Sequence, residues 1–316
     1  MKKRLKILIP ILLGVLFIYL TFKITSVQER ELILNYIKSA KIQYLLLAML
    51  IGATSDVIRG IRWQLLSKQL GYNSNTITSI GSVFMCYTSN MAIARSGEFI
   101  RASVLSNYNK IPISKTLGTI AAERIVDVLI SMLILFLVWT LQYDLIFESF
   151  LEDGFLFFIN DNFKFIILIA LIVLLFLSII ITKINSVRKF LRNIINGLFS
   201  ITKLKWRMPF FILYSILIWG CYILAFLVIK FSVDEFSIID YNLIFPAFVI
   251  GVYSISLSNH GLGVYPLAIS LFLSNFGINT ELGLTYGWLA WSCQAIITLF
   301  FGGLSFFILP LINRPK

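Results

Sequence analysis

The segment PFFILYSILIWGCYILAFLVIK, residues 209–230, contains no charged residue before its last lysine. A helix needs about 20 mostly apolar residues to cross a hydrocarbon core about 30 Å thick, so this segment predicts a transmembrane helix. Five more mostly apolar stretches occupy 5–22, 42–59, 117–142, 163–182 and 285–311. We therefore expect an all-α polytopic membrane protein with about six full transmembrane helices. Residues 1–316 are expected to form a single integral membrane domain.

The composition excludes a soluble protein. Hydrophobic residues make up 59% of the 316 residues and charged residues only 13%, and the mean hydropathy is +0.90. Soluble domains carry roughly 25% charged residues, so this chain has too few charges to cover a soluble surface. The net charge of +12 arises from basic residues in a few short loops. Such loops are expected to face an anionic membrane surface, and no separate basic domain is present to bind nucleic acid.

The cysteines do not indicate a redox or metal site. Cys86, Cys221 and Cys293 lie far apart in apolar stretches and form no CxxC pair. They predict neither a disulfide framework nor a metal site. The sequence also carries no nucleotide-binding motif, and no cofactor is expected.

Two loops set the expected orientation. Residues 143–162 hold five acids and no lysine or arginine, whereas residues 183–207 hold seven basic residues and no acid. The basic loop is therefore expected on the cytoplasmic side, which places both termini in the cytoplasm and the protein in the bacterial cytoplasmic membrane. Within the basic loop, apolar residues recur at helical spacing over 184–201 and predict an amphipathic helix on the cytoplasmic surface.

Two stretches do not fit as ordinary spans. Residues 76–108 begin moderately apolar and run into the charged segment RSGEFIR, and residues 241–278 lack any charge but are interrupted by SNHGLG at 258–263. Each is expected to be a re-entrant helical hairpin, because broken backbone is tolerated in a membrane only where protein or a water-filled cavity surrounds it. The alternative is about eight transmembrane helices, with both stretches crossing fully.

The hairpin interpretation gives the chain a possible inverted repeat. Span 42–59, a hairpin and span 117–142 would be followed, in the opposite direction, by span 209–230, a hairpin and span 285–311. Many transporters have this architecture, with the binding site near the midplane where broken helices meet. The halves share no detectable sequence identity, so the prediction depends on the pattern of spans alone.

Charged residues next to the first hairpin form the strongest local signal. Arg95, Glu98 and Arg101 are spaced by three, which would place them along one side of a helix. Gly97 between them would let another backbone approach closely. Arginine suits a phosphate head group because its planar fork binds phosphate through two parallel hydrogen bonds.

A second charged group lies within the span 117–142. Glu123 and Asp127 are four residues apart on one helical face, with Arg124 beside the first. Charges inside a span cost several kcal/mol unless paired or hydrated, so a polar cavity holding cations and carboxylates is predicted. The alternative is that Glu98–Arg101 and Glu123–Arg124 are purely structural ion pairs near the interface.

The remaining polar residues receive simpler interpretations. Arg59 and Arg62 are favoured as anchors at the cytoplasmic surface, as the distribution of positive charge in membrane proteins predicts. His260 has no second histidine or cysteine near it, so a hydrogen-bonded hairpin tip is favoured over a metal ligand. Gly261 and Gly263 are expected to permit the turn at that tip.

Three motifs resemble a known family. RSGEFIRA at 95–102, ERIVD at 123–127 and GLGV at 261–264 resemble the lysylphosphatidylglycerol synthase transmembrane, or flippase-like, family of bacterial and archaeal membrane proteins. The family commonly begins its first motif with Pro-Gly-Arg, where this chain has Ile93-Ala94-Arg95, and often has an acid where this chain has Pro266. The second departure puts in doubt any carboxylate role at that position.

The resemblance covers essentially the whole chain and implies a function. In the two-part lipid-modifying relatives, such a domain moves an aminoacylated phospholipid between leaflets, and a separate cytoplasmic domain makes that lipid. These 316 residues include no such domain, so synthase activity is not expected. The first hypothesis is accordingly a lipid translocator, not an enzyme, whose partners are membrane lipids with an anionic or polyprenyl-phosphate head group.

In this hypothesis Arg95 and Arg101 hold the phosphate, and Glu98, Glu123 and Asp127 balance charge or carry protons. The full set expected along the substrate path is Arg95, Gly97, Glu98, Arg101, Glu123, Arg124, Asp127, Asn259, His260, Gly261 and Gly263. One alternative is an intramembrane transferase that uses a lipid-linked donor, with Glu29 and Glu31 as the exposed acids. The other is a membrane scaffold in which polar residues only hold helices together.

Overall fold

A computed structural model describes residues 15–141 and 199–313, apart from 17, 24 and 94, and within 142–198 it describes only 192, 195 and 196. Every element in these parts of the chain is a helix. Four helical segments are long and apolar enough to cross a membrane: α3 (Ile42–Gln69), α6 (Ile113–Leu141), Lys205–Ile229 and α13 (Thr280–Ile312). The all-α class is therefore confirmed for the described residues, and the number of crossings stays a prediction.

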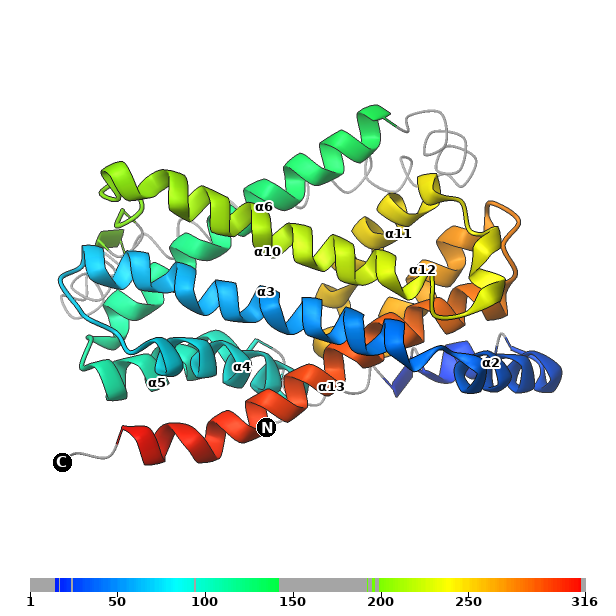
Figure 1. Cartoon of the computed structure of the whole chain (residues 1–316), viewed down its shortest axis with the longest axis horizontal. Helices are drawn as coiled ribbons and strands as arrows, with labels where there is room; N and C mark the ends of the chain where they lie inside the picture. Colours follow the sequence, from blue (N-terminus) through cyan, green and yellow to red (C-terminus); the bar gives the residue numbers. More distant parts are fainter. Residues whose placement is uncertain are drawn as a thin grey trace, which may run out of the picture.

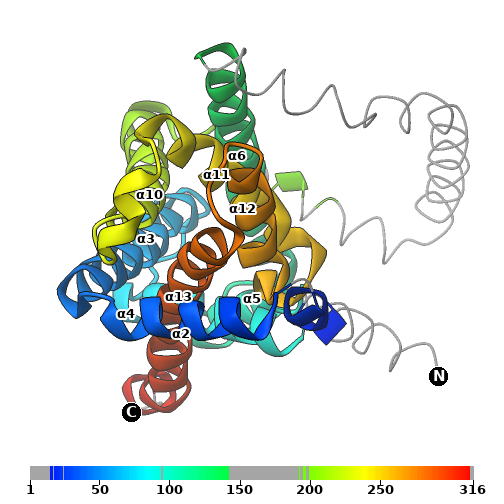
Figure 2. The same ribbon diagram turned by 90° about the vertical axis from the view of Figure 1, so that its right-hand side faces the viewer.

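Some expected segments lie outside the described residues. These are the first part of span 5–22, the loop 143–162, the span 163–182 and most of the amphipathic helix 184–201. The segment between the expected spans 5–22 and 42–59 is described, and it forms α2 (Val27–Ser39), a helix with no buried residue. Ser26 and Glu29 cap each other's backbone at its start. Figure 2 shows α2 lying across one end of the helical bundle.

The stretch 76–108 folds into a helical hairpin. Its two arms are α4 (Thr76–Ala92) and α5 (Gly97–Asn109). The Asn75 side chain caps the start of α4 by accepting a hydrogen bond from the Ile77 amide at 2.9 Å. In Figure 1 the hairpin starts at the end of the bundle where α3 finishes, and it returns to the same end, where α6 begins.

The stretch 241–278 forms a second hairpin at the opposite end of the bundle. Its arms are α11 (Tyr241–Ser254) and α12 (Val264–Ser274), joined through the short turns η3 (Ile255–Leu257) and η4 (Asn259–Gly261). It is entered from α10 (Met208–Ile229) by way of η2 (Asp234–Ile238), and it is followed by α13. Figure 1 shows α3 and α13 running one way along the bundle and α6 and α10 running the other. This is the order of elements that the expected inverted repeat requires.

The backbone is broken at both hairpin tips, and side chains satisfy the groups that the breaks release. At the first tip the Gly97 amide donates to Asn90 Oδ1 at 2.8 Å, and Ser96 Oγ donates to the Ser89 carbonyl at 3.1 Å. At the second tip Trp291 Nε1 donates to the His260 carbonyl at 2.9 Å. Backbone groups inside a membrane need such partners, because no bulk water is present to replace them.

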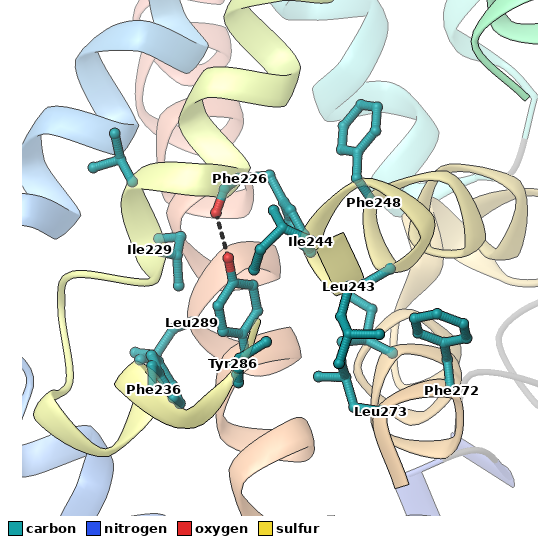
Figure 3. Close-up of a cluster of buried hydrophobic side chains, with 14 of the residues drawn as sticks. Phe226, Ile229, Phe236, Leu243, Ile244, Phe248, Phe272, Leu273, Tyr286 and Leu289 are labelled. Carbon is teal, nitrogen blue, oxygen red and sulfur yellow. Dashed lines mark hydrogen bonds between the residues drawn. The ribbon is translucent and has the colours of Figure 1, made fainter. Parts of the chain in front are cut away.

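Apolar packing fixes the second half of the molecule. In Figure 3 the Tyr286 hydroxyl of α13 donates to the Phe226 carbonyl of α10, and the bond is 2.7 Å long. Phe236 of η2 and Phe248 of α11 pack into the same cluster. Gly287 lets α13 approach α12 so closely that a Cβ there would overlap the backbone of Pro266. Small residues at helix contacts are typical of membrane proteins, where packing drives association.

Candidate functional site

Arginines of α3 meet carboxylates of α6 in the interior of the bundle. Arg59 Nη1 contacts Asp127 Oδ2, and Arg62 Nη1 lies 2.8 Å from Asp127 Oδ1. Arg62 Nε also lies 3.4 Å from Glu123 Oε1. Residues three or four apart share one face of a helix, and α3 and α6 run in opposite directions. Successive arginines of α3 therefore meet successive carboxylates of α6 along the contact between the two helices. Arg59 and Arg62 are both buried.

The first hairpin extends this network. Arg101 Nη1 of α5 lies 2.8 Å from the second oxygen of Glu123, and both side chains are 1% exposed. Glu98, one turn earlier on α5, pairs with Arg124 at 3.2 Å, and each of these side chains is 34% exposed. The inner pair is thus sealed by packing, whereas the outer pair faces open space.

Helix α10 contributes two hydroxyl groups. Ser215 Oγ lies 2.8 Å from Arg62 Nη1 and ties α10 to the pairs between α3 and α6. Further along α10, the Tyr222 hydroxyl lies 3.5 Å from Arg59 Nη2 and 3.4 Å from Asp56 Oδ1. Asp56 is completely buried on α3. The structure shows no ion pair for Asp56 among the described residues.

Beside this network lies a cavity of about 880 Å³ that reaches both hairpins. Its charged lining residues Arg59, Glu98, Arg124 and Asp127 come from α3, α5 and α6, and these residues are called the polar wall. The apolar and aromatic lining residues come from α10, α11, η3 and α13 and are called the apolar wall: Trp219, Phe226, Phe248, Ile255 and Trp291. A cavity with one charged and one apolar wall suits an amphiphile, whose head group and hydrocarbon need different surroundings.

Arg95 gives the cavity an excess of positive charge. It lies in the break between α4 and α5, its φ of 61° is left-handed, and its side chain lines the cavity. Within the described part of the chain no ion pair or hydrogen bond is formed by its guanidinium. The three lining arginines, Arg59, Arg95 and Arg124, face two lining acids, Glu98 and Asp127, which leaves one positive charge unbalanced.

A buried donor on the polar wall also lacks a partner. Arg59 Nε is enclosed and meets no hydrogen-bond acceptor among the described atoms. Leaving a buried donor unsatisfied costs about 1–3 kcal/mol, and more for a charged group. An anionic oxygen in the cavity would balance the positive charge of Arg95, which has no counter-ion among the described residues. The arginines of the polar wall are therefore suited to an anionic group.

The structure brings together some of the expected site residues and separates others. Arg95, Glu98, Arg124, Asp127 and His260 all line the cavity. Arg101 and Glu123 do not line it, and they form a buried ion pair with each other.

The expected glycines act through the backbone. A Cβ on Gly97 would overlap the Cys86 carbonyl oxygen, so the expected close approach is confirmed. Gly261 and Gly263 have φ angles of 79° and 74°, which confirms their expected role in the turn. The side chain of Asn259, also expected on the substrate path, lies outside those that the structure describes.

Three sequence-based interpretations need correction. Arg59 and Arg62 are not surface anchors, because they are buried and paired with Asp127 and Glu123. The alternative ion pairs Glu98–Arg101 and Glu123–Arg124 are not formed, since Glu98 pairs with Arg124 and Arg101 pairs with Glu123. Arg95 does not lie along a helix with Glu98 and Arg101, because α5 begins only at Gly97.

Sequence reasoning missed Asp56, Arg59 and Arg62 as one group. The signal was present, since the three residues are spaced by three, but the span was expected to end at residue 59. In the structure α3 continues to Gln69, which carries all three inside the bundle. Tyr87 and Tyr222 also line the cavity. Neither tyrosine belongs to a charged or glycine-containing motif, so no sequence pattern pointed to it.

Comparisons with known proteins agree with the resemblance found in the sequence. The chain is 32% identical over 83 residues to a glycosyltransferase, AglD, of Haloferax volcanii. This match covers 26% of the chain and 13% of the relative, so the chain spans only a small part of that protein's length. No solved structure matches the chain significantly. The family described as the lysylphosphatidylglycerol synthase TM region matches residues 7–302, and the chain belongs to this family.

Proposed function

We propose that the protein moves a lipid with a phosphate head group between the two leaflets of a membrane, and that the central cavity holds this lipid in transit. The observation that carries the proposal is the division of the cavity into a polar wall and an apolar wall. The head group would lie against Arg95 and Arg59, and the acyl or prenyl chain against Phe226, Phe248 and Trp291. Membership of a family named for lysylphosphatidylglycerol synthesis supports a role in membrane lipid chemistry.

The arrangement of the hairpins supports the same proposal. Each hairpin enters from one end of the bundle and ends near the middle, where the Tyr87 and His260 rings approach to 6.3 Å between centroids. We place both hairpins in the membrane as re-entrant segments of an inverted repeat. Rocking of one repeat against the other would then open the cavity to each leaflet in turn. The membrane is the bacterial cytoplasmic membrane in this proposal, with both termini on the cytoplasmic side.

The test is lipid exchange between leaflets of proteoliposomes. Fluorescent phosphatidylglycerol and a labelled polyprenyl phosphate serve as probes, and loss of fluorescence to an added membrane-impermeant quencher reports movement. We expect exchange faster than in protein-free vesicles. Arg95→Gln should slow it by about tenfold or more, since a hydrogen bond to a charged group contributes about 1.5–3 kcal/mol. Lys110→Gln is the matched control, because Lys110 is exposed and does not line the cavity.

A second candidate comes from the named relative. Similarity to a glycosyltransferase favours transfer from a lipid-linked donor as the alternative. Mass spectrometry of lipids recovered from the same vesicles separates the two functions. Movement without covalent change supports translocation, and covalent change without movement supports a transferase. Neither effect, with protein that remains folded, would support the scaffold hypothesis and contradict the proposal.

A further inference from the structure

We propose that Asp56 binds a proton together with the anionic lipid head group, so that a proton gradient drives the lipid across the membrane. This inference rests on the proposed function and adds its source of energy. The residue that carries it plays no part in the sequence-based hypotheses, and it does not itself line the cavity.

Asp56 differs from every other acid of the network. Glu98, Glu123 and Asp127 each have an arginine nitrogen within 4 Å, whereas no ion pair is found for Asp56 among the residues that the structure describes. Asp56 lies midway along α3 and is 0% exposed. A buried carboxylate without an ion-pair partner is costly in its charged form. Proton binding removes this cost, whereas the paired acids of the network gain nothing from it.

The groups around Asp56 come from four neighbouring elements and its own. Arg59 lies one turn further along α3. The Tyr222 hydroxyl of α10 and the Gln294 amide of α13 interact with the Asp56 carboxyl group. The positive charge of Arg124 on α6 acts on the same carboxyl group electrostatically. Tyr87 of α4 lies next to Tyr222. The positive charges of Arg59 and Arg124 stabilise the ionised form of Asp56 while the cavity is empty. An anion bound to these arginines would offset their charge and so remove this stabilisation.

Tyr222 provides the connection between Asp56 and the cavity. Its ring lines the cavity, and its hydroxyl lies 3.4 Å from Asp56 Oδ1 and 3.5 Å from Arg59 Nη2. A hydroxyl group both donates and accepts, so it can pass a proton from cavity water to the carboxylate. The same hydroxyl therefore touches the proton site and an arginine of the lipid site.

Charge balance explains why the proton and the anion would bind together. The network contains five arginines, Arg59, Arg62, Arg95, Arg101 and Arg124, and four acids, Asp56, Glu98, Glu123 and Asp127. With all of them ionised the empty network carries a net charge of +1. A phosphodiester adds one negative charge and a proton on Asp56 removes one, so the loaded network again carries +1. The empty and loaded forms then meet similar electrostatic costs inside the membrane.

The test uses the proteoliposome exchange assay with a pH difference across the membrane. In the wild-type protein the gradient should shift the distribution of labelled lipid toward one leaflet, and reversal of the gradient should reverse the shift. Asp56→Asn keeps the carbonyl oxygen that accepts from Tyr222 but cannot release a proton, so the shift should vanish. Asp56→Glu should retain it. Asp234→Asn is the matched control, since Asp234 is exposed and pairs with Lys41 away from this cavity.

A second measurement covers the case in which Asp56→Asn does not fold. Detergent-solubilised wild-type protein in weak buffer is mixed with a short-chain phosphatidylglycerol, and proton uptake is recorded with a pH dye. We expect about one proton per bound lipid at a pH where the acid is ionised in the empty protein. A gradient response that persists in Asp56→Asn, or binding without proton uptake, overturns the inference. Absence of any lipid movement in the wild type instead contradicts the proposed function.

Discussion

At the scale of single residues, the ion pairs of the interior divide into those that hold the structure and those that face the cavity. Arg62 is completely buried and contacts Glu123, Asp127 and Ser215, which come from two other helices. Arg101 is sealed against Glu123. Arg95, in contrast, is exposed and unpaired among the described residues. The same residue type therefore serves two purposes within one site.

The sealed pair makes a prediction about stability. Arg101→Gln leaves Glu123 buried with Arg62 as its only described cation, and breaking a buried pair costs about 3–5 kcal/mol. We expect a marked fall in the midpoint of thermal unfolding of the purified protein in detergent. The double variant Arg101→Gln, Glu123→Gln should recover much of that loss, because no unpaired charge remains. Arg95→Gln, the same chemical change at an exposed arginine, should leave the midpoint unaltered.

An equal fall of the unfolding midpoint in Arg95→Gln and Arg101→Gln would contradict this division of roles.

At this scale the sequence was only partly informative. Charged residues inside spans could be recognised as a group, because each needs a partner in a membrane. Their partners could not be predicted, since Glu98 has arginines both three residues away and on a neighbouring helix. Only the packing of α5 against α6 brings Glu98 to Arg124 and Arg101 to Glu123.

At the scale of elements, close contact between helix backbones decides how the first hairpin closes. α5 begins at Gly97, directly against the last turns of α4. The Gly97 amide donates to Asn90 Oδ1, and a Cβ on Gly97 would overlap the Cys86 carbonyl oxygen. A larger residue would push α5 away from α4 and move Glu98 and Arg101 with it. The hairpin that the sequence predicted from its polar interruption therefore depends on this one glycine for its geometry.

Gly97→Ala tests this dependence. The added methyl group would overlap the Cys86 carbonyl, and overpacking of this kind costs about 1–3 kcal/mol. We expect lower thermal stability and slower lipid exchange, both measured on the purified protein. Gly220→Ala is the matched control, because a Cβ at Gly220 in α10 meets nothing within 4 Å. In a helix interior alanine is favoured over glycine by about 1 kcal/mol, so this control should be neutral or slightly stabilising.

A destabilised Gly220→Ala with an unaffected Gly97→Ala would show that α5 does not depend on this contact.

Element boundaries illustrate the limits of sequence patterns. The break at 258–263 could be predicted, because polar and glycine residues interrupt an apolar run there. The break at 93–96 was not placed, since Arg95 was expected on one helix with Glu98 and Arg101. The ten additional residues of α3 were also missed, because the segment from Gly60 to Gln69 mixes polar with apolar residues and is buried by its neighbours.

At the scale of the whole molecule, two sets of three elements occupy the bundle in opposite directions. α3, the first hairpin and α6 form one set, and α10, the second hairpin and α13 form the other. The number and order of these elements follow from the spacing of apolar stretches, which is why the sequence could predict them. The contact between the sets could not be predicted, because it depends on which side chains meet at the tips.

This arrangement predicts a membrane topology that can be measured. In a background with Cys86, Cys221 and Cys293 replaced by alanine, single cysteines are placed at Asn73 and Lys110, which flank the first hairpin, and at Ser237 and Asn279, which flank the second. All four positions are exposed. If both hairpins are re-entrant, a membrane-impermeant thiol reagent added to sealed, oriented vesicles labels the first two positions from one side. It should then label the other two only from the opposite side, because each hairpin returns to the end from which it entered.

The alternative of about eight crossings makes a different prediction. A full crossing by α4 or by α11 would bring the break after it to the far surface. Cysteines at Ser96 and at Ser256, each placed singly at a hairpin tip, would then react from the side opposite to their flanking positions. α4 has only 17 residues, however, and α11 has 14, both below the roughly 20 that a crossing needs. We therefore expect the tip cysteines to react slowly, and only with small reagents that can enter the cavity; rapid labelling of Ser96→Cys from the far side would establish a full crossing and remove the inverted repeat.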